Sequence, residues 1–338
     1  MTTETPTDVA TSAIRRQCLQ ALGSLLLTGF AEPLLAQSDH KMERLKTDSR
    51  NGWAVAASNF HGIYDDEPLR AHFGDFLRHV YSIFPPDKFH TLIAEVSRQN
   101  TNDKDIYLTC QRRLGEITPM ANQVRNALPA LLSQTEVVGR QLLRMLDGRS
   151  AIDGYMEIGT KGGYIGYAQS RLTLRGDLVL LNTEAASYAL GDLFERRVVR
   201  KIGRFVDLND YRPLSNSAVA TASLDVVCNP IGFHHSPLER RDEFVSSLRR
   251  CLRKGGLLIV RDHDVHSPAM NQMVALAHDV FNMGLIHPWM HNQQEIRNFT
   301  SLRELGDYLA KFGFRPTGQA LYQAGDPTLN AMIGFVAT

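Results

Sequence analysis

Two stretches in the second half of the chain carry side chains that can take up or release a proton. His234 and His235 follow one short apolar run, and His263 lies in a charged segment that follows another, at residues 257–260. An imidazole titrates near neutral pH, so it can act as a general base on a hydroxyl or an amine. These three histidines are the candidate catalytic residues. The alternative is that His234 and His235 cap a turn and bond backbone carbonyls.

A third stretch, residues 155–163, is an apolar run that leads into a glycine-rich turn. Gly159, Gly162 and Gly163 can adopt positive φ and have no side chain, so a ligand can lie close to the backbone there. The turn is therefore a candidate ligand cradle, although such turns also serve as plain connections in α/β folds. The polar residues of the stretch are Glu157, Thr160 and Lys161.

Strands and helices alternate from about residue 150 to the end of the chain. Such alternation predicts a parallel sheet with helices on both faces. Its carboxyl edge is where ligands bind in open α/β sheets. The segments near 321 and at 330–336 predict a closing antiparallel pair. The other predicted strands are 155–158, 177–182, 205–208, 225–229 and 257–260, with helices at 164–170 and 238–251.

Polar residues follow three of these predicted strands. Glu184 lies just past the second strand, where a carboxylate can accept hydrogen bonds from both hydroxyls of a ribose. Asn182 is nearly as well placed, and an exposed loop carboxylate is the alternative for Glu184. Asp207 with Leu208 ends the third strand, and Asn229 ends the fourth. All of these residues should meet at the carboxyl edge of the sheet.

The segments resemble those of the class I S-adenosylmethionine-dependent methyltransferases. The pattern acidic-x-Gly-x-x-x-Gly at residues 157–163 is similar to motif I of that family, with Lys161 where the family often has a glycine. Asp207 and Leu208 match the pair that contacts the adenine. Residues 225–235 are similar to the fourth-strand segment, and residues 252–262 to the turn into the fifth strand. The segments follow the family's order over residues 150–338.

The resemblance implies a Rossmann-like seven-stranded sheet, S-adenosylmethionine as cofactor, and methyl transfer to oxygen, nitrogen or carbon of a small organic acceptor. Two alternatives remain: a binding or scaffold protein that keeps the fold without turnover, and an enzyme that uses the sulfonium for another reaction, such as a cyclisation. The cofactor-binding residues implied by the resemblance are Glu157, Gly159, Thr160, Lys161, Gly163, Asn182, Glu184, Asp207, Leu208 and Asn229.

The first 150 residues have a different character. Residues 39–149 carry apolar residues at three- and four-residue spacing, which predicts a helical domain that acts as a lid, a substrate wall or a homodimer surface. Within residues 1–38, Arg15 and Arg16 precede an apolar run, as in a twin-arginine export signal. A packed helix is the alternative. Because Glu32 and Pro33 interrupt the run, we place the protein in the cytoplasm ahead of export, without a stable membrane span.

Composition excludes several classes of function. The 338 residues contain 37 Lys and Arg against 36 Asp and Glu, a net charge of +1, so no general nucleic-acid binding is expected. The four cysteines are too far apart for a disulfide framework. The histidines between 263 and 291 match no zinc spacing, so no metal is expected. Residues 278–284, Trp289 and residues 295–299 predict a cap over the acceptor pocket, although their apolar side chains would suit a core just as well.

Overall fold

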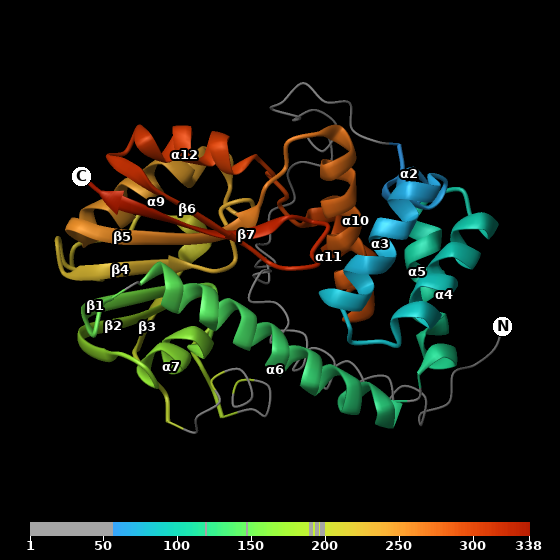
Figure 1. The fold of residues 1–338 in the computed structure, drawn as a ribbon, viewed down its shortest axis with the longest axis horizontal. Helices are drawn as coiled ribbons and strands as arrows, with labels where there is room; N and C mark the ends of the chain where they lie inside the picture. Colours follow the sequence, from blue (N-terminus) through green and yellow to red (C-terminus); the bar gives the residue numbers. More distant parts are fainter. Residues whose placement is uncertain (1–56, 119, 147, 189–191, 193–195, 197–199) are drawn as a thin grey trace.

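The computed structural model describes residues 57–338, except for residues 119, 147, 189–191, 193–195 and 197–199. The export-signal-like pattern in residues 1–38 therefore lies outside the described residues. Within the described ranges, no helix is long and apolar enough to cross a membrane. Figure 1 shows two parts side by side, a sheet layered with helices and a group of helices next to it.

In the described part of the chain, seven strands form one mixed sheet of order β3-β2-β1-β4-β5-β7-β6. The neighbours from β3 to β5 pair in parallel, whereas β7 is antiparallel to both β5 and β6. The predicted closing antiparallel pair is thus confirmed. The strands are β1 (Ala151–Ile158), β2 (Thr173–Asn182), β3 (Arg204–Asp207), β4 (Leu224–Asn229), β5 (Leu252–His263), β6 (Phe314–Tyr322) and β7 (Asn330–Ala337).

Helices cover both faces of this sheet. On one face, α9 (Leu238–Cys251) and α12 (Leu302–Ala310) pack Phe244 and Leu305 into a core with strand residues such as Val227. On the other face, α7 (Gly163–Gln169) and the end of α6 (Met120–Met145) pack around Tyr155 and Ile259. Because both faces are buried, the central strands contain continuous apolar runs, such as residues 226–228 of β4 and 257–260 of β5. The layering and strand order are those of the class I methyltransferase fold.

The helical part has a core of its own that includes helices from both halves of the chain. Its aromatic centre contains Tyr81, Phe84, Phe89 and Phe281. Phe281 belongs to α10, which packs against α2 and α5 as a member of this core, in agreement with the core alternative for this segment. The helices are α2 (Asn59–Tyr64), α3 (Glu67–His79), α4 (Pro86–Gln99), α5 (Asp103–Ile117), α10 (Pro268–Gly284) and α11 (Trp289–Gln294).

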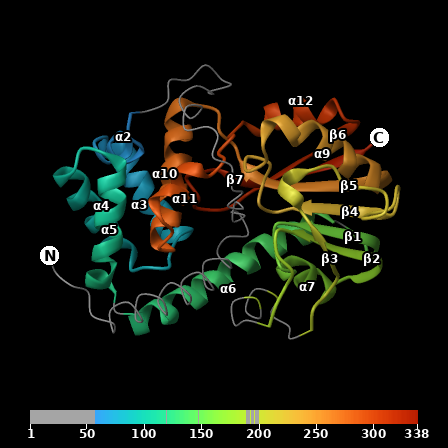
Figure 2. The same cartoon turned by 180° about the vertical axis from the view of Figure 1, so that it is seen from behind.

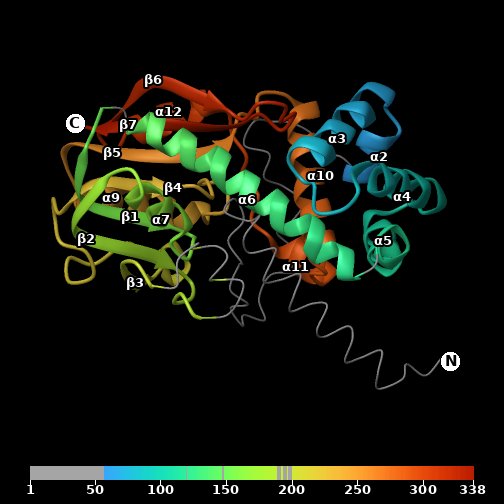
Figure 3. The same ribbon diagram turned by 60° about the horizontal axis from the view of Figure 1, so that its bottom comes forward.

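The long helix α6 runs from the helical part to the sheet, as Figure 3 shows. It lies in the region of residues 39–149 that the sequence predicted to be helical, begins at Met120 and continues through Pro129. Its last turns pack against α7 and β7, where Val138 and Leu142 are buried. The helical region before the sheet is therefore tied to the sheet by a continuous element.

Candidate functional site

The carboxyl ends of the parallel strands face the helical part. β5 ends at His263, and the chain enters α10 at Pro268, so the helical part lies directly beyond this edge of the sheet. Figure 2 shows the same arrangement from behind, with α10 next to the ends of β5 and β7. Ligands of open α/β sheets bind at this edge. All candidate site residues named from the sequence lie at this edge or in the turns that follow it.

The glycine turn after β1 has the backbone that its sequence predicts. Gly159 has φ of +77°, and Gly162, which precedes the first residue of α7, has φ of +100°. Gly163 opens the helix itself. The buried Ile231 lies against Gly159: its Cδ1 would be only 2.3 Å from a Cβ added there. A side chain at Gly159 would therefore strain the backbone and overlap a core residue.

The Glu157 carboxylate is buried beneath this turn and holds it in place. It accepts hydrogen bonds from the backbone N–H groups of Tyr164 at 3.2 Å and Ile165 at 2.5 Å, and from the hydroxyl of Thr160. Burial raises the pKa of Glu157 to about 7, although these donors act in the opposite direction. Glu157 thus caps the start of α7, where the helix dipole favours negative charge.

Lys161, in the glycine turn, forms ion pairs with two carboxylates that follow β2 in the chain. Its Nζ lies 3.0 Å from Oε2 of Glu184 and 3.5 Å from Oδ1 of Asp192. The Glu184 side chain is 66% exposed, whereas Asn182 is buried and its side-chain oxygen accepts a hydrogen bond from the Thr183 N–H. Of the two residues predicted to hold a ribose, Glu184 is therefore the accessible one.

The ends of β3 and β4 differ in burial. Asp207 is exposed, and its carboxylate accepts a hydrogen bond from the Asn209 N–H at 2.8 Å. Leu208 is packed in the core. Asn229 is fully buried beside β1, and in the described part of the chain neither its amide nitrogen nor its oxygen has a hydrogen-bond partner. Leaving a buried amide unsatisfied is costly, so Asn229 is a strong candidate for a ligand contact.

Four buried histidine rings gather where β4 and β5 end. His234 is at the centre, with its ring centroid 4.1 Å from that of His235, 5.6 Å from that of His263 and 5.3 Å from that of His278. The predicted bases are thus brought together. Sequence reasoning did not group His278 with them. The only local signal was a histidine followed by an acidic residue within the apolar text of residues 273–284.

Asp262 fixes the position of His234. Its Oδ1 lies 2.5 Å from Nδ1 of His234, and its carboxylate also accepts hydrogen bonds from the backbone N–H groups of Phe233 and His263. Burial acts to raise the pKa of Asp262, but the adjacent His234 and His263 together with the hydrogen bonds lower it to about 2. The ionised carboxylate therefore holds the proton of His234 on Nδ1, which leaves Nε2 with a lone pair.

The remaining histidines differ in their partners. Burial, together with the nearby His234, lowers the pKa of His263 to about 3, and its Nδ1 donates to the Thr328 carbonyl at 3.0 Å. A base this weak removes protons poorly near neutral pH. His235 Nδ1 lies 3.1 Å from the Ile296 carbonyl oxygen. Burial also lowers the pKa of His278, whose Nδ1 lies 3.3 Å from Oε2 of Glu295.

A polar network between α10 and residue 297 supports this cluster. The partly buried Arg297 lies 2.7 Å from Asp279 and 2.8 Å from Glu295, and Asn282 and Asn292 bond the same carboxylates. Burial acts to raise the pKa of Glu295, but Arg297 and His278 hold it well below its usual range. Glu295 is thus an ionised, immobilised group behind His235 and His278.

No protein-family model matches the chain, and no curated protein matches it. Among solved structures, the Burkholderia thailandensis 1,6-didemethyltoxoflavin N1-methyltransferase, bound to S-adenosylhomocysteine, is 14% identical over 60% of this chain and 78% of its own, with a TM-score of 0.40. The CurJ carbon methyltransferase is 14% identical over 98% of this chain and 93% of its own, with a TM-score of 0.43. The trans-methyltransferase CalH in complex with S-adenosylhomocysteine is 15% identical over 97% of this chain and 91% of its own, with a TM-score of 0.42. These likenesses are too distant to establish a shared function.

Proposed function

We propose that the protein transfers the methyl group of S-adenosylmethionine to a small organic acceptor. The observation that carries this proposal is the buried Asn229, whose amide has no hydrogen-bond partner in the described part of the chain and which lies next to the β1 strand that enters the glycine turn. A buried amide without a hydrogen-bond partner lowers the free energy of unfolding, and a bound ligand that contacts it would offset this cost. The proposal gives the amide a ligand to bind.

The residues around Asn229 fit this cofactor. The glycine turn lets a ligand approach the backbone at Gly159, and Glu184 offers an accessible carboxylate for ribose hydroxyls. Asp207 offers a second exposed carboxylate at the end of the neighbouring strand, where Asn182 and Asp207 are paired in register. Glu157 and Thr160 hold the turn in shape from beneath.

Methyl transfer requires alignment of the acceptor and, for a hydroxyl, thiol or amine, removal of its proton. The cofactor supplies the methyl group. Among the three predicted bases, His234 is the best placed, because Asp262 orients its ring, stabilises the imidazolium and leaves Nε2 to take the proton. His263 is held neutral with a low pKa and lines the cluster instead.

One observation favours the alternative of a binding protein without turnover. Lys161 already pairs with Glu184 at 3.0 Å, and this ion pair must rearrange or be shared if Glu184 binds a ribose. This alternative predicts that the purified protein binds S-adenosylmethionine but forms no S-adenosylhomocysteine with any acceptor tested.

Calorimetric titration with S-adenosylmethionine and S-adenosylhomocysteine tests the proposal, with Asn229→Leu as the decisive variant. Leucine has a similar volume and removes an unsatisfied polar group, so we expect unchanged or higher thermal stability together with loss of cofactor binding. Asp207→Ala should weaken binding about 10–100-fold through loss of a charge-assisted contact. The exposed Asp307→Ala on α12 is the matched control and should bind as the wild type does.

The outcome against the proposal is equally clear. If the wild type binds neither S-adenosyl compound, the methyltransferase function is wrong. If Asn229→Leu binds both as tightly as the wild type, Asn229 is not a ligand contact and the proposal loses the observation on which it is based.

A further inference from the structure

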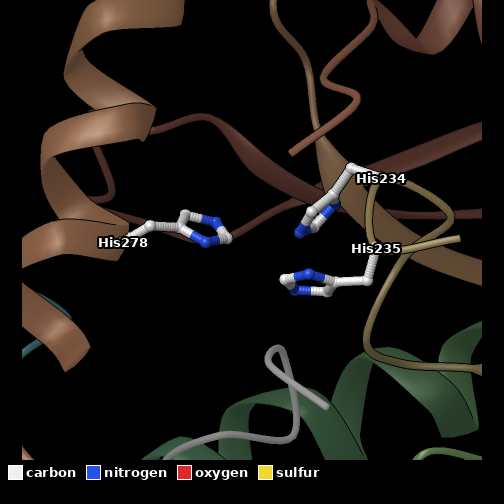
Figure 4. A group of neighbouring side chains, drawn as sticks. All are labelled: His234, His235 and His278. Atoms are coloured by element: carbon white, nitrogen blue, oxygen red, sulfur yellow. The ribbon is translucent and has the colours of Figure 1, made fainter. Parts of the chain in front are cut away.

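We propose that His234, His235 and His278 form a binding site for a divalent transition-metal ion, with Zn²⁺ as the best match. One ring nitrogen from each of the three lies within 4.8 Å of those of the other two, and all three side chains are buried. Figure 4 shows the rings directed toward one another, two from the turn after β4 and one from α10. No ligand role for these side chains follows from methyl transfer itself, so the site is an additional feature of the protein.

Each of the three rings is oriented as a metal-binding histidine is. Such histidines direct the ring nitrogen that does not bind the metal at a carboxylate or a backbone carbonyl. Here Nδ1 of His234 lies 2.5 Å from Asp262, and Nδ1 of His278 lies 3.3 Å from Glu295. Nδ1 of His235 lies 3.1 Å from the carbonyl oxygen of Ile296. In the proposed site, Nε2 of each ring is the ligand atom and Nδ1 is the nitrogen held by the protein.

The Nε2 atom of His234 gives an independent indication of a ligand. His234 is only 3% exposed, and in the part of the chain that the structure describes this nitrogen has no hydrogen-bond partner. Because Asp262 holds the proton on the opposite nitrogen, Nε2 is a buried lone pair directed into the cluster. A metal ion would satisfy it without any other polar partner.

The spacing of the rings is close to that of a tetrahedral site. With a Zn–N bond of about 2.0–2.1 Å, tetrahedral angles place the centroids of neighbouring imidazole ligands about 5 Å apart. The His234–His278 and His235–His278 centroids are 5.3 and 5.4 Å apart. The His234–His235 pair is closer, at 4.1 Å, and would open by about 1 Å to reach the same geometry.

The charges around the rings favour a cation. Asp262, Asp279 and Glu295 are buried about the cluster, and the guanidinium that contacts two of them belongs to Arg297. Asp262 and Glu295 lie directly against the rings of His234 and His278, and a buried cation needs such compensation. Two of the three carboxylates also orient the proposed ligands, so the same groups position the rings and offset the charge.

Among the residues that the structure describes, the cluster offers three imidazole ligands, and a site with three protein ligands is typical of a catalytic rather than a structural metal ion. The open position is occupied by water or by a donor atom of a substrate, such as a hydroxyl or a thiol. Coordination at Nε2 excludes proton removal by His234. In the metal-bound protein, the ion would instead lower the pKa of a coordinated hydroxyl or thiol, whose proton would pass to water, and His234 would be the base only in the metal-free protein.

Metal binding is tested on the full chain without an affinity tag, after treatment with a chelator and in the absence of S-adenosyl compounds. We expect calorimetric titration with Zn²⁺ to give one site per chain and Zn²⁺ to raise the thermal unfolding temperature. Titration with Co²⁺ should give the visible absorption of a four- or five-coordinate nitrogen and oxygen site. Failure of methyl transfer does not affect these readouts, and failure of metal binding leaves methyl transfer standing.

Variants assign the site to these residues. His278→Ala removes a ligand and should weaken Zn²⁺ binding at least 100-fold, whereas Asp262→Asn only loosens His234 and should weaken it about 10–100-fold. His266→Ala changes an exposed histidine near the cluster in sequence and should bind Zn²⁺ within twofold of the wild type. If His278→Ala does not fold, His235→Ala provides the same comparison.

Two results would overturn the proposal. The first is a wild type that binds less than one Zn²⁺ per chain and shows no rise in unfolding temperature. The second is a Zn²⁺ affinity that is the same in the wild type and in a folded variant lacking His278 or His235, because the ion would then occupy another site.

Discussion

Replacing Gly159 by alanine should destabilise the protein for two separable reasons. Its φ of +77° lies in the left-handed region, where a Cβ clashes with the backbone. The new Cβ would also lie 2.3 Å from Cδ1, 2.9 Å from Cγ1 and 3.0 Å from Cγ2 of Ile231. Because Ile231 is fully buried, its side chain has no solvent into which it can swing.

Each reason has its own magnitude. The left-handed backbone costs a non-glycine residue about 1–2 kcal/mol. Overpacking against a buried side chain adds about 1–3 kcal/mol. Gly159→Ala should therefore lower the free energy of unfolding by about 2–5 kcal/mol, less the small gain from restricting the unfolded chain.

Urea denaturation of two further variants separates the contributions. Gly255 has φ of +80° and open space around the position of its Cβ, so Gly255→Ala measures the backbone cost alone. In the double variant Gly159→Ala/Ile231→Ala the overlap is removed, and its destabilisation should be about 1–3 kcal/mol smaller than the sum of the two single changes.

The comparison also shows what would refute this reasoning. If Gly159→Ala costs no more than Gly255→Ala, Ile231 does not pack against the turn. If the two single changes simply add in the double variant, any extra cost of Gly159→Ala has another origin.

Two other predictions concern buried charges. The pKa of Glu157 is 4.5 in the unfolded chain and is raised to about 7 in the folded protein, so folding becomes less favourable as the carboxyl ionises. The free energy of unfolding of the wild type should therefore fall by about 3 kcal/mol relative to that of Glu157→Gln as the pH rises from 4.5 to 7. Urea denaturation of both proteins measures this difference. A flat difference between the two would contradict the burial effect. Arg297→Met leaves Asp279 and Glu295 buried without their cation and should cost about 3–5 kcal/mol in the same assay, whereas the exposed Arg315→Met should cost little. Equal costs would exclude a role for the network in stability.

Much of the sheet could be predicted from local sequence. The predicted strand at 205–208 is observed as Arg204–Asp207, and the predicted helix at 238–251 is α9 with the same bounds. Apolar runs and their spacing suffice here, because each strand is buried on both faces and each helix on one. The glycine turn was also predictable, since positive φ at Gly159 and Gly162 is a property of single residues.

The longer elements were less predictable. Pro129 lies inside α6, although an internal proline removes a helix hydrogen bond. The helix persists where its last turns pack on α7 and β7. Likewise, nearly all of residues 273–284 of α10 are buried because the helix packs between the sheet and the helical part, and no local pattern indicates that its partners are α2 and α5.

The sequence by itself determined the order of the strands along the chain, the glycine turn and the identity of His234, His235 and His263 as candidate groups, because these depend on residue type and on neighbours a few positions away. Only the tertiary structure decided that Glu157 caps α7, that Asn229 is left without a partner among the described residues, and that His278 joins His234 and His235 from 44 positions away in the chain. The physical reason is that burial and side-chain partners across the sheet edge depend on how α10 packs between the sheet and the helical part. Spacing along the sequence does not specify that packing.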